Sequence, residues 1–198
     1  MSEQGEHWRL FVAVVLPDSV LAQVGRVQER LQGLAPERAA RWVRPEGIHI
    51  TLKFLGDAPV SQLDALRAAL DAAVEGHSAF ELYAAGLGAF PHTKQPRVLW
   101  IGLSGDIAEL NAVRESVEER ISPLGFPTEK RDFHPHLTLA RAARGASRAD
   151  QAALGELVDK IDLPRLVTWR VEGISLIRSD LGPGGAQYTQ VHLAPLGS

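Results

Sequence analysis

The stretch Ile48-His-Ile-Thr-Leu-Lys-Phe54 decides how this chain folds, because its central pattern returns as His136-Leu-Thr-Leu139. In a β-strand, alternate side chains point to the same face of the sheet. His49, Thr51 and Lys53 are therefore predicted to share one face of a strand. The other face is apolar and is predicted to pack into the core, with Ile48, Ile50, Leu52 and Phe54.

The second stretch has the same two-faced pattern. His136 and Thr138 share one face, and Leu137 and Leu139 share the other. The chain contains 7 His and 6 Thr, so a His followed two positions later by Thr is rare by chance, yet the pattern occurs twice. Two such strands packed face to face would place two imidazoles and two hydroxyls in one cleft.

The elements around the two stretches also occur twice in the same order. Each copy begins with a β-like run and a helical pattern before its His-containing strand, at residues 9–16, 19–31 and 48–54 and again at 97–103, 106–121 and 136–139. Each copy continues with a helix, a strand and a turn-rich loop, at 61–74, 80–90 and 91–96 and again at 148–158, 167–177 and 182–185. A last strand follows near residues 187–193.

The repeated order predicts an α+β fold with two lobes related by a pseudo-twofold axis, each made of a β-sheet and helices. The active site would lie in the cleft between the lobes. No linker rich in Gly or Ser separates the copies, so we expect one bilobed domain over residues 8–196. The alternative interpretation is a coincidence among common α/β patterns.

The composition limits the functions that are open to the chain. It has 198 residues, with 21 Lys and Arg against 24 Asp and Glu, and a formal net charge of −3. This balance argues against binding long nucleic acids by bulk positive charge, but it does not exclude a local basic site. The absence of cysteine excludes disulfides, cysteine-ligated metals and a thiol nucleophile. No apolar run is long enough to span a bilayer, so we expect a cytoplasmic monomer that binds no membrane.

Two histidines across a cleft suit concerted acid–base catalysis. Histidine titrates near neutral pH, so one imidazole can donate a proton while the other accepts one. Attack of water on a phosphodiester needs both, because the water loses a proton and the leaving oxygen gains one. Threonine hydroxyls can bind phosphate oxygens. Lys53, on the predicted His49 face, would add positive charge to the cleft or simply be solvated.

Other residues near the two motifs carry weaker interpretations. His134 and His136 form a His-Pro-His sequence, but two histidines without a matching carboxylate make a poor metal site, so we expect no metal. Trp42 and Trp100 are predicted to be packing residues. Four basic residues would form a rim for the phosphates of a ligand or be merely solvated: Arg41, Arg44, Lys130 and Arg131.

Both His-x-Thr-x motifs lie within longer stretches that match a known family. These are Arg9-Leu-Phe-Val-Ala13, Arg41-Trp-Val-Arg-Pro-Glu46, Ile48-His-Ile-Thr-Leu-Lys-Phe-Leu-Gly56, Pro96-Arg-Val-Leu-Trp-Ile-Gly-Leu103, Phe133-His-Pro-His-Leu-Thr-Leu-Ala-Arg141 and Arg178-Ser-Asp-Leu-Gly-Pro-Gly-Gly185 with Tyr188-Thr189. Over nearly its whole length the chain resembles the 2H phosphoesterase superfamily, and within it the bacterial RNA 2′,3′-cyclic phosphodiesterases, also called 2′–5′ RNA ligases. Neither motif departs from the family pattern.

The resemblance implies a reaction and a role for each motif residue. It implies hydrolysis of a 2′,3′-cyclic phosphate at an RNA end to a 2′-phosphate, without a metal or nucleotide cofactor. It implies that His49 is the proton donor and His136 the proton acceptor, an assignment that two near-identical motifs cannot make by themselves. It also implies that Thr51 and Thr138 bind the phosphate and that Arg141 contacts the nucleotide.

The place of Arg141 conflicts with simple strand geometry. Strict alternation puts its side chain on the same side as Leu137 and Leu139, which are predicted to be core. The strand would have to end there, or Pro135 would have to disturb the pleat, to free Arg141 for a ligand.

Three alternatives to hydrolysis of RNA ends stay open. The same site could join 2′–5′ RNA ends in the reverse direction. It could open a cyclic phosphate on a small nucleotide or on an ADP-ribose derivative. The third alternative belongs to another class, a module that binds RNA ends without catalysis.

Overall fold

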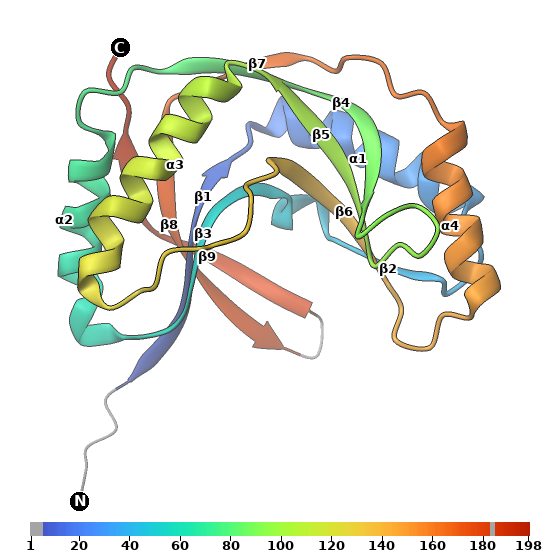
Figure 1. The fold of residues 1–198 in the computed structure, drawn as a ribbon, viewed down its shortest axis with the longest axis horizontal. Helices are drawn as coiled ribbons and strands as arrows, with labels where there is room; N and C mark the ends of the chain where they lie inside the picture. Colours follow the sequence, from blue (N-terminus) through green and yellow to red (C-terminus); the bar gives the residue numbers. More distant parts are fainter. Residues whose placement is uncertain (1–5, 183–184) are drawn as a thin grey trace, which may run out of the picture.

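The computed structural model describes residues 6–182 and 185–198, which form two antiparallel β-sheets covered by helices (Figure 1). The strands are β1 (His7–Val15), β2 (Ala40–Trp42), β3 (His49–Pro59), β4 (Phe80–Phe90), β5 (Val98–Gly105), β6 (His136–Ala142), β7 (Thr168–Val171), β8 (Gly173–Gly182) and β9 (Gly185–Pro195). The helices are α1 (Asp18–Leu34), α2 (Leu63–Val74), α3 (Ile107–Ile121) and α4 (Arg148–Lys160). Among the described residues, no helix is long and apolar enough to cross a membrane.

The strands form two separate sheets. Sheet A has the strand order β3-β1-β8-β9, and sheet B has the order β2-β6-β5-β4-β7. Helices α2 and α3 lie on the sheet A side of the molecule, and α1 and α4 lie on the sheet B side (Figure 1). Helix α1 is tied to sheet B by Gln28, whose side-chain amide donates to the carbonyls of Val43 at 2.6 Å and Leu139 at 2.8 Å. The predicted α+β fold with two sheets is confirmed.

The two copies of the repeat exchange elements instead of forming one sheet each. Strands β1 and β3 of the first copy pair in sheet A with β8 of the second, and β5 and β6 of the second copy pair in sheet B with β4 of the first. The helices also cross over, because α1 follows β1 but packs on sheet B, and α3 follows β5 but contacts β3 of sheet A. Each lobe is therefore built from both halves of the sequence.

The prediction of one strand over residues 167–177 is wrong. The segment is divided at Glu172 into β7, which pairs with β4 in sheet B, and β8, which pairs with β1 and β9 in sheet A. The chain changes sheet there, while the apolar pattern runs on through the break. Residues 183 and 184 of the predicted turn lie outside the described residues, but Gly182 and Gly185 on either side of them pair as in a hairpin.

A β-bulge in β3 changes which side chains face the core. Strand β1 pairs with Lys53 and then directly with Thr51, so Leu52 is an extra residue. Leu52 and Lys53 are both buried as a result, and the next side chain, that of Phe54, is 66% exposed. The predictions that Lys53 shares the polar face of this strand and that Phe54 packs into the core are therefore wrong.

Strand β6 has a bulge at the matching place. Strand β5 pairs with Ala140 and then directly with Thr138, so Leu139 is the extra residue. Leu139 and Ala140 are both buried, and Arg141 is exposed. The bulge, rather than the end of the strand or Pro135, thus frees Arg141 from the core side.

The middle of sheet A is buried on both faces. On one face of β1, Leu10, Val12 and Val14 join the large core that the two sheets share with the helices. On the other face, Phe11 and Ala13 form a small cluster with Ile177 of β8. Full burial of a large apolar side chain contributes about 1.5–3 kcal/mol. The small cluster forms an apolar surface beside His49 at the start of β3.

Candidate active site

Both motif histidines are oriented by the same backbone contact. His49 begins β3, and its Nδ1 lies 2.8 Å from the carbonyl oxygen of Gly47. His136 begins β6, and its Nδ1 lies 2.6 Å from the carbonyl oxygen of His134. A carbonyl only accepts hydrogen bonds, so these contacts assign the proton to Nδ1 in each neutral ring. Each Nε2 is thereby left to accept or donate the proton of a reaction.

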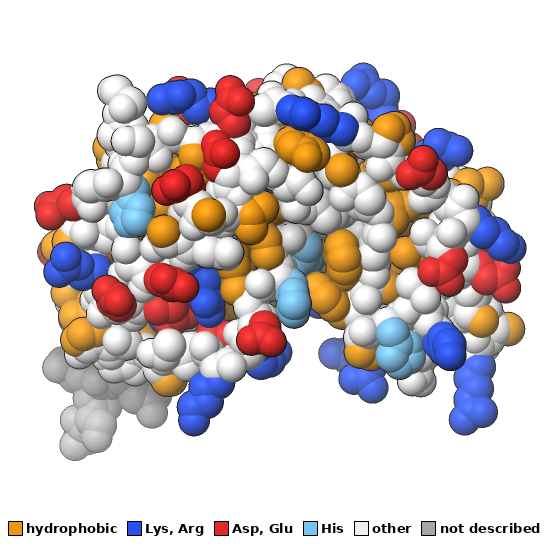
Figure 2. All heavy atoms as spheres, turned by 45° about the horizontal axis from the view of Figure 1, so that its top comes forward, with side chains coloured by type: hydrophobic (Ala, Val, Ile, Leu, Met, Phe, Trp, Pro, Cys, Tyr) orange, Lys and Arg blue, Asp and Glu red, His pale blue; other side chains and the backbone are white. Residues whose placement is uncertain are grey.

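The two histidines face one cleft. Strands β3 and β6 contact each other where the two sheets meet. Figure 2 shows that the molecule is hollowed between its halves, with histidine side chains in the wall of the hollow and Lys and Arg side chains along its rim. The charge of His136 also lowers the pKa of His49.

Burial keeps both imidazoles neutral in the free protein. The pKa of His49 is lowered to about 4, mainly by desolvation and further by His136, against the raising effect of its hydrogen bond to Gly47. The pKa of His136 is also lowered, mainly by desolvation and further by the charges of Arg141 and His134. An anion bound between the rings would raise both pKa values, because it stabilises the protonated forms.

Aromatic rings hold His49 in place. The Phe11 ring stacks on the imidazole with centroids 4.7 Å apart. Tyr188 of β9 meets the imidazole edge-on at 5.3 Å and meets Phe11 in the same manner at 5.2 Å. The exposed Phe54 ring lies 6.2 Å from Phe11, which places it on the same face of sheet A as His49. This wall of the cleft is therefore mainly aromatic.

A second aromatic group surrounds His136. Phe90 meets the imidazole edge-on with centroids 5.0 Å apart, and Trp100 lies 6.1 Å from it. The Trp100 ring covers Gly88, where a Cβ atom would lie only 2.1 Å from the indole, so a side chain there would displace it. Trp100 packs as predicted, but it also contacts a motif histidine.

The sequence pattern assigned no role to three residues that contact the motif histidines: Phe11, Phe90 and Tyr188. Each comes from a strand other than the one that carries the histidine it contacts. Their places depend on strand pairing, which periodicity along one segment does not reveal. One local signal existed for Phe11, which alternates with the core-facing residues of β1.

The two motif threonines lie on the cleft faces of their strands. Thr51 and Thr138 are partly exposed, and each follows its histidine by two positions in the same strand. Within residues 6–182 and 185–198, neither hydroxyl has a protein hydrogen-bond partner. Both hydroxyls can therefore bind an anion held between the imidazoles.

Lys53 does not supply positive charge to the cleft. The bulge in β3 turns the side chain to the core side, where it is only 3% exposed. Its Nζ donates to Oε2 of Glu118 on α3 at 2.5 Å and to the carbonyl oxygen of Pro127 at 2.8 Å. Glu118 also accepts from Arg114 at 3.4 Å. The predicted role of Lys53 in binding substrate is wrong, because its ammonium group belongs to this buried network.

Arg141 takes the cleft-facing position that the bulge in β6 creates. Its charge contributes to the lowered pKa of His136, beside the larger effect of desolvation. Of the four residues of the predicted basic rim, Arg131 is already engaged, because it donates to the Glu129 carboxylate at 2.6 Å. In the described part of the chain, no group of three or more His, Asp or Glu side chains could hold a metal ion.

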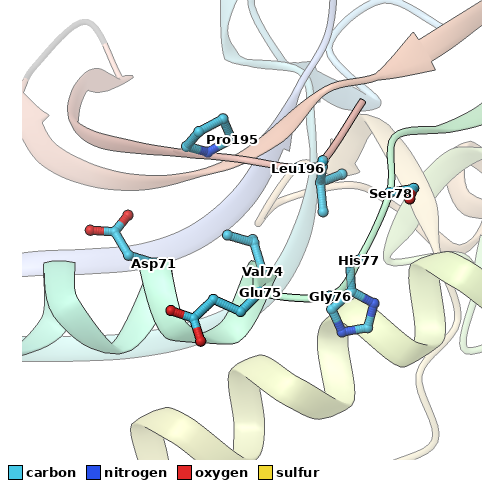
Figure 3. Close-up of a pocket in the computed structure, with 9 residues that line it drawn as sticks. Asp71, Val74, Glu75, Gly76, His77, Ser78, Pro195 and Leu196 are labelled. Atoms are coloured by element: carbon cyan, nitrogen blue, oxygen red, sulfur yellow. The ribbon is translucent and has the colours of Figure 1, made fainter.

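A separate hollow of about 530 Å³ lies between the end of α2 and the C-terminal residues (Figure 3). The motif histidines, the motif threonines, Lys53 and Arg141 are all absent from its lining. His77 turns toward α3, where its Nε2 lies 2.9 Å from Oγ of Ser116. The Asp71 carboxylate contacts Nε2 of His192 at 2.7 Å. These side chains are engaged in packing contacts, so this hollow is not a second candidate site.

Comparison with known proteins shows to which family the chain belongs. Residues 16–183 match the model of the 2′-5′ RNA ligase superfamily. The chain belongs to this superfamily. Among its relatives, the RNA 2′,3′-cyclic phosphodiesterase of Methanothermobacter thermautotrophicus is 31% identical, over 93% of this chain and 97% of the relative. That of Aeropyrum pernix is 36% identical, over 76% and 82% of the two chains.

Solved structures of the superfamily have the same fold. The structure of E. coli LigT complexed with 3′-AMP matches with a TM-score of 0.77 at 25% identity, covering 98% of this chain and 100% of the other. A Thermus thermophilus protein matches with a TM-score of 0.76 at 29% identity, over 96% and 99% of the two chains. The family resemblance predicted from the sequence is confirmed.

Proposed function

We propose that this 2′-5′ RNA ligase superfamily protein hydrolyses 2′,3′-cyclic phosphate ends of RNA to 2′-phosphate ends without a metal ion. The observation that carries the proposal is the pair of imidazoles in one cleft, each with Nδ1 held by a backbone carbonyl two residues earlier. This arrangement leaves one Nε2 on each strand for proton transfer. The names of relatives that align with most of the chain support the same reaction.

The reaction needs one proton acceptor and one proton donor on opposite sides of the phosphorus. In the proposed mechanism, Nε2 of His136 takes a proton from water as the water oxygen bonds to phosphorus. The bond from phosphorus to the 3′ oxygen breaks, and Nε2 of His49 gives its proton to that oxygen. Attacking and leaving oxygens lie roughly in line in phosphoryl transfer, which suits two histidines from two facing strands. The products are a 2′-phosphate and a free 3′ hydroxyl.

The proposed donor must be protonated before the reaction, although the free protein holds it neutral. The negative charge of a bound cyclic phosphate raises the pKa of His49 and so favours its charged form. Thr51 and Thr138 donate hydrogen bonds to the non-bridging phosphate oxygens. Arg141 offsets the charge that builds up on these oxygens in the transition state.

The deciding experiment identifies the product of a defined RNA end. An RNA oligomer with a 2′,3′-cyclic phosphate is incubated with the protein, and the product is assigned by ³¹P NMR and mass spectrometry. We expect a 2′-phosphate, in the presence of EDTA as well as in its absence. A 3′-phosphate would show that the 2′ oxygen leaves and would contradict the proposed geometry, and loss of activity with EDTA would contradict the metal-free mechanism.

The same experiment tests the other activities. An added RNA with a free 5′ hydroxyl reports ligation, because that hydroxyl would replace water as the attacking group and give a 2′–5′ bond. A cyclic phosphate of an ADP-ribose derivative, offered at equal concentration, reports a small-molecule preference. Binding of a 2′-phosphorylated end without turnover of any cyclic phosphate would indicate a binding module and contradict the proposed hydrolysis.

A further inference from the structure

Two arginines lie directly opposite each other in neighbouring strands of sheet B. Arg41 of β2 pairs with Arg141 of β6, so both side chains project from the same face of the sheet. Both residues are exposed. Like charges at directly opposed positions of an antiparallel pair are destabilising. The pair therefore costs stability unless an anion lies over it.

The protein itself supplies no such anion. In the part of the chain that the structure describes, the ion pairs join other side chains, and neither Arg41 nor Arg141 takes part in one. Carboxylates are not scarce, because Asp and Glu outnumber Lys and Arg by 24 to 21. The exposed Arg131, by contrast, does have a partner in Glu129 at 2.6 Å. The two opposed arginines are thus open to an external anion.

The order of the strands in sheet B gives two positions for an anion, one over β6 and one over β2. Arg141 lies in the strand of His136 and, in the proposed mechanism, binds the reacting phosphate. Arg41 lies one strand further out, on β2 at the edge of sheet B, and neighbouring strands are about 4.8 Å apart. This spacing leaves room for a second anionic group of the same ligand over Arg41, further from the histidines than the group over Arg141.

The opposite wall gives the direction in which the ligand leaves the cleft. Phe54 occupies on β3 the place that Arg141 occupies on β6, directly after the bulge. The sheet A wall carries Phe11, Phe54 and Tyr188 beside its histidine. A chain of phosphates is accordingly attracted across β6 and β2 and not across β3.

We propose that Arg41 binds the phosphodiester that joins the terminal nucleotide to the one before it. The proposal rests on the proposed function and makes RNA ends of at least two nucleotides the preferred substrate over a mononucleotide cyclic phosphate. A mononucleotide cyclic phosphate reaches the two histidines and Arg141 but has no group for Arg41. Arg41 is thus a specificity residue, and it has no part in the proton transfers.

The test compares two substrates in the variant Arg41→Gln. The substrates are adenosine 2′,3′-cyclic phosphate and a dinucleotide that ends in the same cyclic phosphate. We expect kcat/KM to fall about tenfold for the dinucleotide, since hydrogen bonds to charged groups are among the stronger ones, and to stay within about twofold for the mononucleotide. The slope of log kcat/KM against log salt should decrease by about 0.7 for the dinucleotide alone, as for one lost phosphate contact on a single strand.

A matched control removes an exposed arginine from the other edge of the same sheet. Arg170 lies on β7, at the opposite end of sheet B, and Arg170→Gln should leave both substrates unaffected. Equal losses on both substrates, or no loss on the dinucleotide, would overturn the role of Arg41. Failure of the unaltered protein to hydrolyse either substrate would instead overturn the proposed function, so the two failures are distinguishable.

Discussion

Strands β3 and β6 are two versions of one element, and they differ in chemical character at two positions after the bulge. Both begin with a histidine held by a carbonyl, continue with a threonine and bulge at the residue after it. The buried position after the bulge is Lys53 in β3 and Ala140 in β6. The exposed position is Phe54 in β3 and Arg141 in β6. The two strands thus carry the same reacting groups. The residue after the bulge is an aromatic side chain on the sheet A wall of the cleft and a cation on the sheet B wall.

The largest predicted effect is a loss of kcat, and it tests whether both strands supply a catalytic histidine. His49→Ala and His136→Ala should each lower kcat by about 10²-fold or more, the low end of acid–base contributions, because each strand supplies one proton-transfer group. Steady-state kinetics on an RNA cyclic phosphate measures this, with circular dichroism to verify folding. His92→Ala, in the exposed loop before β5, serves as the control and should keep normal activity. Near-normal turnover in either motif variant would end the two-histidine mechanism.

The next prediction concerns the buried position at which the strands differ, Lys53 in β3. Lys53→Met leaves the Glu118 carboxylate buried without its ammonium partner, which should lower the free energy of unfolding by about 3–5 kcal/mol. Denaturant unfolding measures the loss. The double variant Lys53→Met with Glu118→Leu should recover part of it, because no unpaired carboxylate remains. A single variant as stable as the original protein would show that the network contributes little.

At the exposed position where the strands differ, a substitution of Arg141 should have a smaller effect on catalysis, with two measurable results. Arg141→Gln should lower kcat/KM by about tenfold or more, the range of a hydrogen bond to a charged group. It should also raise the pKa of His136, because the guanidinium charge lowers it in the original protein. Kinetics gives the first value and NMR titration of the imidazole gives the second. An unchanged pKa would place Arg141 away from the histidine.

The smallest predicted effects are shifts in pH dependence. Since both imidazoles have pKa values below the ordinary 6.5, with His49 at about 4, the optimum of kcat/KM should lie on the acid side of 6.5. The optimum of kcat should lie at higher pH, because bound phosphate raises both values. NMR titration with and without inorganic phosphate checks the shift directly. Titration of His49 at 6.5 or above in the free protein would contradict its desolvation.

The same lowered pKa values predict how stability responds to acid. The unfolded chain takes up a proton on His49 near pH 6.5, whereas the folded chain does so only near pH 4. Stability should therefore decline as the pH falls through this window, since the unfolded state binds more protons there. His49→Phe should weaken the decline, measured by thermal unfolding at a series of pH values. A decline of equal steepness in the variant would assign the effect to other groups.

The sequence predicted most elements and both motif strands, and its errors within the motif strands share one physical cause. Periodicity of two placed His49, Thr51, His136 and Thr138 on the faces where the structure has them, because no irregularity precedes them in their strands. It failed immediately after each threonine, where one extra residue reverses the alternation. Leu52-Lys53 and Leu139-Ala140 contain neither glycine nor proline, so nothing local marks the bulge.

Features that depend on distant pairing were also beyond the sequence pattern. The division at Glu172 follows from β7 pairing with β4 and β8 pairing with β1, which are far apart in the chain. The rings around the histidines depend on the same pairings. The single domain predicted over residues 8–196 stays a prediction, and the exchange of strands between the copies supports it.

Because β8 completes the sheet that begins with β1, and β4 completes the sheet of β5, neither half of the sequence closes a core by itself. A chain that held one copy alone would need a second copy to complete both sheets, as in a symmetric dimer with swapped strands. Such a dimer must carry the same residue after both bulges. Only a chain that holds both copies can place Phe54 on one wall of the cleft and Arg141 on the other.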